Sequence, residues 1–498
     1  MGILASGIKN QYIQLTRPLS MPTNLNIGWA KRFSSIPAKI RLLRIRRLYN
    51  KGKWEAARKY ALKEINCPFN NQLSRSIIIR SYWNESKWDR VISLAEKWPE
   101  LDTNGYKVRA IEKSAFKTAT GKYLEDLSSR EPEPVSFAQS SWNETDLLSN
   151  WYQEDTRVWL RHPWGWTYWD MPENYDIKHT HPSLLELVME TLLRPFLSQV
   201  KSIKTEKRPD GKEISLSYSG GTDSSAAALL MPEETLLAYH ERSFYSMINH
   251  ENQHQLFQVW NDIKKRSILT VPSNHELIRT HHQKPIGFST DYAAGSHLIL
   301  LADHLDIGHI AFGTPIDNTW LNKGLEYRDF SLSNHWIYWS NRFAHAGLKL
   351  ELPINHISEA GALRICQQSS FNESINSCLR GKNGQGCGRC WKCFHKNGPL
   401  GRPVDPTSRE IQTFLMKRPL RSAQHALWAI QVQEFEHLVE HLAPYLKEDL
   451  SWWVQIYEPG LKLISEQLRE IIKTNTMKYL SMMDQPYLLE SVNLFAPD

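Results

Sequence analysis

The chain has 498 residues, of which 41% are hydrophobic and 23% are charged, and its formal net charge is +7. This composition is typical of globular proteins and excludes a fully disordered or collagen-like chain. No run of 18 uninterrupted apolar residues occurs, so no membrane-spanning helix is predicted, and about 150 residues per domain gives two or three domains.

The positive charge is concentrated in the N-terminal segment. Residues 1–54 contain 11 Lys and Arg and no Asp or Glu, most densely between Arg41 and Arg47. Three interpretations remain open: the solvated face of a basic helix, a surface that contacts the anions of nucleic acid or lipid headgroups, and an organellar presequence. Only six cysteines occur, four of them in one cluster, which favours a reducing compartment, and we expect a cytoplasmic protein.

An internal repeat with a period of 34 residues follows. At this offset the matching pairs are Tyr49 and Trp83, Asn50 and Asn84, Lys53 and Lys87, Trp54 and Trp88, Glu55 and Asp89, and Ala61 and Ala95. A weaker third copy at 121–127 arrives one residue late. The period, with an aromatic residue after a short polar turn, resembles tetratricopeptide (TPR) hairpins, which stack because one hairpin cannot bury its own apolar face. The alternative is two ordinary helical hairpins with a chance similarity.

The composition changes near residue 130, where the Pro- and charge-rich segment 128–136 predicts a linker. Residues 156–172 predict two aromatic strands around a Pro-Trp-Gly turn, and residues 181–200 have helical spacing. Four further strands are predicted at 213–218, 235–240, 267–272 and 309–314, with helical patterns between them. This alternation predicts an α/β fold, a doubly wound parallel sheet with helices on both faces. The residues after 408 predict a helical C-terminal region.

The strongest local motif joins the predicted strand 213–218 to an Ala-rich helix. It consists of Ser219, Gly220, Gly221, Thr222, Asp223, Ser224 and Ser225. Two glycines let backbone N–H groups approach a ligand closely, and the helix N-terminus and the serine hydroxyls add donors, which suits a pyrophosphate group. Asp223 is a candidate Mg²⁺ ligand or helix-cap carboxylate. We therefore predict a phosphate site, with a generic Gly-rich turn as the alternative.

The second motif is a cluster of four cysteines, Cys378, Cys387, Cys390 and Cys393. Thiolates on short turns can complete the tetrahedral coordination of Zn²⁺, and Gly386 and Gly388 permit such turns. A site closed by four cysteines has no open coordination position, so its role would be structural. An iron–sulfur cluster is the main alternative. Cys67 and Cys366 are isolated and are expected in the core.

Residues 212–400 resemble one family through these two motifs. SGGTDS resembles the PP-loop of N-type ATP pyrophosphatases, and together with the spacing of the four cysteines it resembles the 7-cyano-7-deazaguanine synthases (QueC). The resemblance implies ATP cleavage between the α- and β-phosphates and activation of 7-carboxy-7-deazaguanine, or a related carboxylate, for attack by ammonia or an amine. It also implies an adenine site beside Ala238, and it matches Gly313 and Asp317 to the family's Gly-x-x-x-Asp loop. At the family's substrate-loop Arg-Asn pair, this chain has Phe288-Ser289.

The sequence leaves three function classes open. The first is an AMP-forming carbon–nitrogen ligase that uses ATP, Mg²⁺ and Zn²⁺, with Ser219, Asp223 and Ser224 as catalytic residues. QueC-like proteins with added domains also occur in bacterial defence systems, where they are linked to the modification of a protein partner. The second class is a PP-loop enzyme that modifies tRNA, with the basic segment gripping phosphates. The third is a TPR-like scaffold with a non-catalytic nucleotide fold.

The predicted organisation has five parts. Residues 1–36 are a basic arm, 37–130 TPR-like repeats that receive a protein or peptide, 131–207 a linker with the hairpin and a helix, 208–400 the ATP-dependent domain with its zinc site, and 401–498 a helical region.

Overall fold

The computed structural model describes residues 29–85, 87–101, 106–107, 110–111, 114, 141–243, 248–282, 284, 286–322, 326–415, 423–439, 442–443, 446 and 451–493. The chain divides into two compact units, Met1–Thr118 and Ala119–Asp498. The first 28 residues of the predicted basic arm, the third repeat copy and the predicted linker lie outside the described residues.

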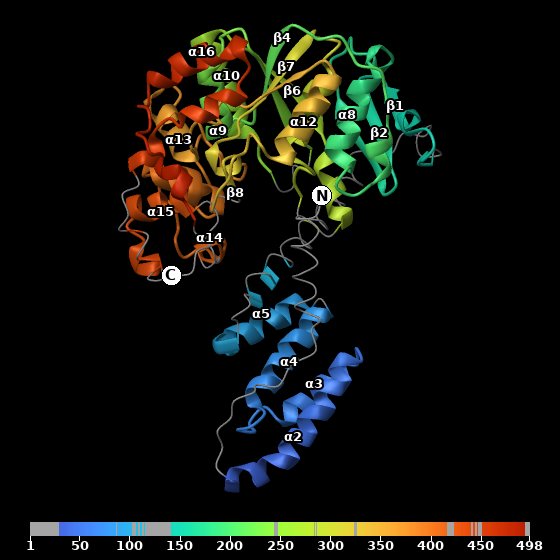
Figure 1. Ribbon diagram of the computed structural model, residues 1–498, viewed down its shortest axis with the longest axis vertical. Helices are drawn as coiled ribbons and strands as arrows, with labels where there is room; N and C mark the ends of the chain where they lie inside the picture. Colours follow the sequence, from blue (N-terminus) through green and yellow to red (C-terminus); the bar gives the residue numbers. More distant parts are fainter. Residues whose placement is uncertain are drawn as a thin grey trace. The chain divides into compact units, whose positions relative to one another are not determined.

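The first unit is built from helices that follow one another closely (Figure 1). Its longer helices are α2 (Trp29–Asn50), α3 (Trp54–Lys63), α4 (Asn71–Asn84) and α5 (Trp88–Lys97). They share one buried cluster, to which Ile45, Ala57, Ile78 and Val91 contribute. The basic stretch lies on α2, where Arg41 is exposed and its guanidinium contacts the Glu64 carboxylate at 2.6 Å.

The 34-residue offset relates equivalent structural positions. Lys53 and Lys87 precede α3 and α5 with nearly the same backbone angles, φ −83° and ψ 62° against φ −89° and ψ 68°. Trp54 and Trp88 each begin a helix and pack, partly buried, against the shared cluster. Ala61 and Ala95, 34 residues apart, are both buried. The repeat thus corresponds to two successive helix pairs, and its assignment to TPR stays a prediction.

The second unit is organised around an eight-stranded sheet with the order β1-β2-β3-β6-β5-β4-β7-β10. The strands are β1 (Trp151–Glu154), β2 (Arg157–His162), β3 (Gly165–Asp170), β4 (Glu213–Ser217), β5 (Leu236–Arg242), β6 (Ile268–Ser273), β7 (Ile307–Phe312) and β10 (Lys349–Glu351). Strands β6, β5, β4, β7 and β10 are parallel. The predicted α/β class with a mainly parallel sheet is confirmed. A small separate sheet pairs β8 (Leu321–Asn322) with β9 (Glu326–Tyr327).

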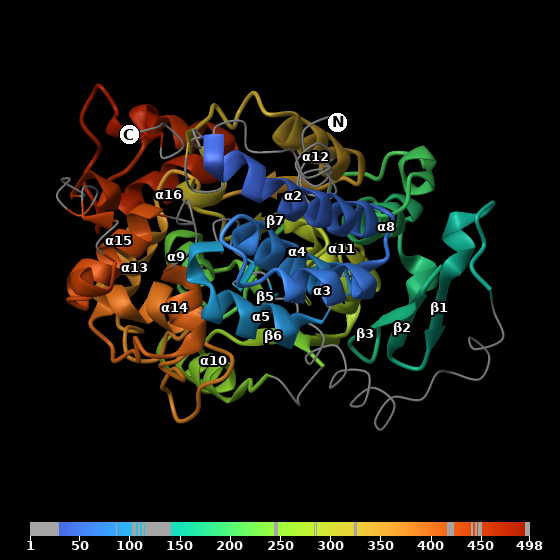
Figure 2. The same ribbon diagram turned by 90° about the horizontal axis from the view of Figure 1, so that it is seen from below.

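The aromatic hairpin extends this sheet and is not a separate layer. Strands β1, β2 and β3 are antiparallel, and Figure 2 shows them side by side at one end of the sheet. β3 joins the parallel strands at the pair Trp169 and Ser273. The Asn274 side chain strengthens this junction because its oxygen accepts hydrogen bonds from the Tyr168 N–H and the Thr167 hydroxyl.

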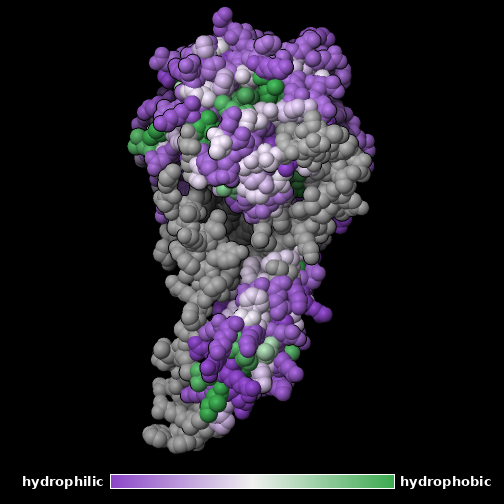
Figure 3. Space-filling model, turned by 90° about the vertical axis from the view of Figure 1, so that its right-hand side faces the viewer, coloured by the Kyte–Doolittle hydropathy of each residue, from purple (hydrophilic) through white to green (hydrophobic). Residues whose placement is uncertain are grey.

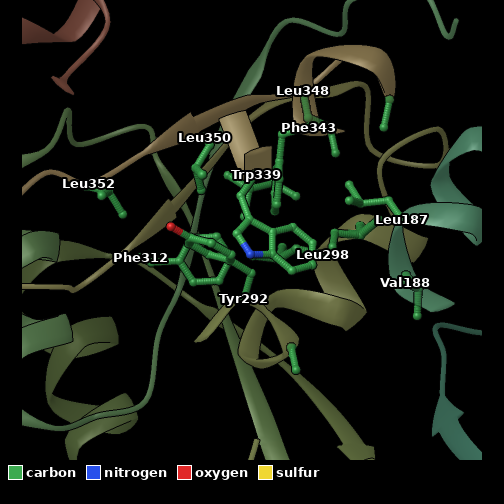
Figure 4. Packing of buried hydrophobic residues seen from close by; sticks show 14 of the residues in the cluster. Leu187, Val188, Tyr292, Leu298, Phe312, Trp339, Phe343, Leu348, Leu350 and Leu352 are labelled. Carbon is green, nitrogen blue, oxygen red and sulfur yellow. The ribbon is translucent and has the colours of Figure 1, made fainter. Parts of the chain in front are cut away.

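Helices cover both faces of the sheet (Figure 1). One face carries α8 (Pro182–Leu193), α11 (Ser296–Leu300) and α12 (Asn334–His345), and the other carries α9 (Thr222–Leu230), α10 (Glu251–Lys264), α13 (Glu359–Gln368) and α16 (Glu466–Met477). Ile310 and Ala311 of β7 contribute to opposite clusters, as the two-residue period of a strand requires. Figure 4 shows the first cluster, where Trp339 and Phe343 of α12 meet Tyr292 and Phe312.

The C-terminal region is part of the same core. Trp453 and Tyr457 belong to the cluster under α8, and Ile456, Leu468 and Ile472 belong to the cluster under α9. Two shorter helices, α14 (Arg409–Leu415) and α15 (Ala423–Val432), pack on Phe394 just after the cysteine cluster. None of the described helices combines the length and apolarity needed to cross a bilayer. On the face shown in Figure 3, small apolar patches interrupt a mostly hydrophilic surface.

Candidate functional site

The order of the parallel strands creates a crevice at the end of β4. Numbered by their position along the chain, the five parallel strands lie in the order 3-2-1-4-5. The direction in which successive strands are added to the sheet therefore reverses between β4 and β7, although the two strands are parallel. Ligands of open α/β sheets bind outside the carboxyl ends of strands at such a reversal. The Gly-rich motif follows β4 directly, and Gly313 follows β7, so both lie at this edge.

Hydrogen bonds between two of its own serines fix the conformation of the Gly-rich loop. Gly220 has a φ of +69°, a conformation that glycine adopts without strain. The Ser219 N–H donates to Ser224 Oγ at 3.1 Å, and the two hydroxyl oxygens lie 3.0 Å apart. α9 begins at Thr222, so its first backbone N–H groups and its positive dipole end are at the loop. This is a suitable arrangement for binding an anion.

A cavity of about 380 Å³ opens at this loop. Five of the predicted residues line it: Ser219, Gly221, Asp223, Ser224 and Gly313. The other predicted residues, Gly220, Thr222, Ser225, Ala238 and Asp317, are buried beside the cavity and do not line it. Their contacts explain this: the Ser225 hydroxyl bonds to the Tyr218 hydroxyl, and the Ala238 carbonyl accepts the Tyr218 N–H. Tyr239 and His240, next to Ala238, do line the cavity.

Gly313 and Asp317 support the loop in different ways. A Cβ atom on Gly313 would lie 2.9 Å from the backbone of Asp223 and Ser224, so only glycine lets β7 end against α9. Asp317 Oδ2 accepts the N–H of Glu359 at 2.7 Å and thereby holds the start of α13. Burial, together with the nearby Glu359 charge, raises the pKa of Asp317 well above its ordinary value.

Lys396 connects the loop to α13 through buried charges. Its Nζ lies 2.8 and 2.9 Å from the two Asp223 carboxylate oxygens and 2.7 Å from Glu359 Oε2. Burial opposes the charge of Lys396, but the two carboxylates outweigh it and raise the pKa of the ammonium. Burial raises the pKa of Asp223, and Lys396 opposes that shift. Lys396 therefore fixes the Asp223 side chain beside the Gly-rich loop.

The wall of the cavity beyond the loop combines cations with flat rings. Arg242, at the end of β5, pairs with the buried Glu276 at 2.6 Å and lies 5.4 Å from the Phe288 ring centre. His240 is 5.7 Å from Phe288, and both of its ring nitrogens are buried with no hydrogen-bond partner among the described residues. Burial holds the pKa of His240 well below its ordinary value, so its imidazole is neutral. Lys392 lines the same cavity.

The four predicted cysteines form the candidate metal centre. Their sulfur atoms all lie within 4.8 Å of one another, with separations such as 3.7 Å for Cys378 and Cys390 and 3.8 Å for Cys387 and Cys393. A tetrahedral ion with metal–sulfur bonds of about 2.3 Å separates its ligands by about 3.8 Å, so the cluster could hold one such ion. A Cβ atom on Gly386 would lie 2.9 Å from Cys393 Sγ, and Gly388 has a φ of +68°.

The metal-binding segment also forms one wall of the cavity. Ser377 precedes the first cysteine, and its Oγ accepts the N–H of Thr222 at 3.1 Å. Trp391, Lys392, His395 and Lys396 lie between or just after the last cysteines and line the cavity. The fold of the cysteine cluster therefore determines where these side chains meet the Gly-rich loop.

Several residues that line or support the cavity belong to neither sequence motif, among them Arg242, Glu359, Ser377, Lys392 and Lys396. Ser377, Lys392 and Lys396 could have been suspected because they lie within three residues of a cysteine. The pairing of Lys396 with Asp223 spans 173 residues, and no local pattern indicates it.

One known sequence family covers part of the site. Residues 338–486 match the model of a family of unknown function (DUF6395). This segment includes α13, the cysteines and Lys396, but not the Gly-rich loop. No curated protein and no solved structure matches the chain.

Proposed function

We propose that the second unit is a QueC-like, AMP-forming ligase that adenylates a carboxylate and couples it to ammonia or an amine. The observation that carries this proposal is the Gly-rich loop at the strand reversal, which lines a cavity with Asp223 held beside it. A loop of N–H and hydroxyl donors at a helix N-terminus suits a triphosphate, as P-loops and related anion sites do.

The roles of the loop residues follow from their positions. Ser219 and Ser224 have hydroxyls 3.0 Å apart on the cavity wall and would donate to the phosphate oxygens of ATP. The carboxylate of the second substrate attacks the α-phosphorus, the α–β bond breaks, and the pyrophosphate leaves into the loop. Donors aimed at the leaving group stabilise the charge that develops there. Ammonia or an amine then displaces AMP from the acyl adenylate.

Two metals belong to this proposal. Asp223 would hold Mg²⁺, which would neutralise charge on the phosphates. Lys396 already contacts both oxygens of this carboxylate, so Mg²⁺ and the Lys396 ammonium would have to share it. Zn²⁺ suits the four cysteines because a closed set of thiolates is a structural site. The candidate substrate is 7-carboxy-7-deazaguanine or a related carboxylate.

The first unit supports a protein-directed role. Its repeated helix pairs are TPR-like in period, and such stacked pairs offer an extended surface to a peptide or protein. In this proposal the partner binds the helices, and the modified group belongs to that partner, as the resemblance to defence proteins implies. The tRNA-modifying alternative by thiolation has less support, because Cys366 is buried, does not line the cavity and has its thiol against the Thr222 carbonyl.

The decisive experiment incubates the protein with Mg-ATP, 7-carboxy-7-deazaguanine and ammonium. We expect AMP and pyrophosphate, together with a loss of one mass unit when the acid becomes the amide. Ser219→Ala should prevent both. The release of ADP and phosphate would contradict the proposal, and an absence of nucleotide binding would favour the scaffold alternative.

A further inference from the structure

The cations of the cavity differ in whether a carboxylate neutralises them. Lys396 contacts Asp223 and Glu359, and Arg242 contacts Glu276. Lys392 lines the same cavity but makes no hydrogen bond or ion pair with any residue that the structure describes. Lys392 is half-buried, and an ammonium that lines a cavity without a carboxylate partner is available to donate to an incoming anion.

The neighbours of Lys392 explain why an anion would be favourable there. Arg242 and Lys396 act on Lys392 as like charges, and Glu276 and Cys390 act on it as opposite charges. Glu276, however, pairs with Arg242 at 2.6 Å, and Cys390 belongs to the cysteine cluster. Asp291 lines the cavity together with Asp223 and Glu359, and its side chain is 78% exposed and lies 3.5 Å from His335. None of these carboxylates forms an ion pair with Lys392, and an incoming anion would be the partner it lacks.

We infer that Lys392 is a second oxyanion-binding group of the cavity, separate from the Gly-rich loop. Its ligand is an oxyanion that enters this cavity, either the carboxylate of the acyl substrate or a phosphate of the nucleotide. The flat rings of Phe288 and His240, which line the same cavity, suit a planar molecule that carries this group. The inference deepens the proposed function and rests on it for the identity of the two oxyanions.

The test compares Lys392→Gln and Lys392→Arg in the full chain by calorimetry with four probes: Mg-ATP, adenosine, 7-carboxy-7-deazaguanine and its neutral carboxamide. Losing one charge-assisted hydrogen bond should weaken the binding of the oxyanion by about 10-fold to 100-fold. If the carboxylate is the ligand, Lys392→Gln loses the preference for the acid over the amide. If a phosphate is the ligand, Lys392→Gln binds Mg-ATP more weakly and adenosine unchanged. Lys392→Arg should keep most of either affinity.

Lys382→Gln is the matched control, because Lys382 is exposed on the same cysteine-bearing segment and does not line the cavity. The metal content of each variant shows whether the cysteine cluster stays intact. The inference is wrong if Lys392→Gln changes the binding of both oxyanions by less than about twofold, or if adenosine and the neutral amide weaken as much as the oxyanions. If the wild-type protein binds the acid through Lys392 but forms no AMP, the proposed function fails while this assignment stands.

Discussion

At the scale of single residues, Ser219 and Asp223 share a proposed role in catalysis but differ in how much they contribute to the stability of the fold. Ser219 is exposed on the loop, and its hydroxyl forms hydrogen bonds with Ser224 and Gly221 of the same loop, whereas Asp223 pairs with a buried ammonium. We expect Ser219→Ala and Asp223→Asn each to abolish AMP formation. Ser219→Ala should change the free energy of unfolding by less than about 0.5 kcal/mol, and Asp223→Asn by more. Product analysis and urea unfolding check this, and AMP formation at the wild-type rate in either variant would contradict it.

Lys396 should matter for stability as well as for catalysis. Replacing it with Met leaves Asp223 and Glu359 facing each other without a cation. Removal of one member of a buried ion pair typically costs about 3–5 kcal/mol, so Lys396→Met should lower the free energy of unfolding by that order. Lys382→Met, on the same segment but exposed, provides the comparison in urea denaturation. A difference between the two variants below about 1 kcal/mol would show that Lys396 does not stabilise the site.

At the scale of elements, the cysteine cluster should couple metal binding to the shape of the cavity. About one Zn²⁺ per chain should co-purify, and Cys387→Ser should lower the thermal midpoint because structural zinc contributes folding free energy. Because Ser377 and Lys396 flank the ligands and contact the loop, the same variant should also bind Mg-ATP more weakly. Cys67→Ser, outside the cluster, is the control. Iron with visible absorbance, or no metal, would contradict the zinc assignment.

The elements also show what a sequence can predict. The strands β4, β5, β6 and β7 were predicted because each is a short apolar run, and the loop after β4 because its glycines and serines are contiguous. The predicted helix 181–200 is too long, since α8 ends at Leu193, two residues before Pro195, whose ring cannot continue a helix. The joining of the hairpin to β6, and the pairs of Arg242 with Glu276 and Lys396 with Asp223, depend on tertiary packing and have no local pattern.

At the scale of the whole molecule, buried histidines should make stability depend on pH. Burial lowers the pKa of His356 to about 3, below the value of about 6.5 in an unfolded chain. As the pH falls below 6.5, His356 therefore binds a proton in the unfolded state but not in the folded state. The free energy of unfolding then falls by up to about 1.4 kcal/mol per pH unit. His356→Gln should reduce the slope of unfolding free energy between pH 7.5 and 5.5. His179→Gln, which is exposed, should leave it unchanged, and an unaltered slope in both variants would contradict the assignment.

The two units should also be separable in function. Each has buried clusters of its own: Ile45 and Val91 share one in the first unit, and Ile310 and Leu216 belong to two different clusters in the second. The described residues of the cavity belong to the second unit alone. Deletion of residues 1–118 should therefore leave the affinity for Mg-ATP within about twofold of the full chain. The truncated protein should no longer capture the partner that we propose binds the helices of the first unit. Because Arg44 and Arg47 lie exposed on α2, capture by the full chain should weaken as salt is raised. Calorimetry with Mg-ATP and salt-dependent capture from the source lysate measure the two effects. A truncated protein that folds but no longer binds Mg-ATP would show that the first unit contributes to the nucleotide site.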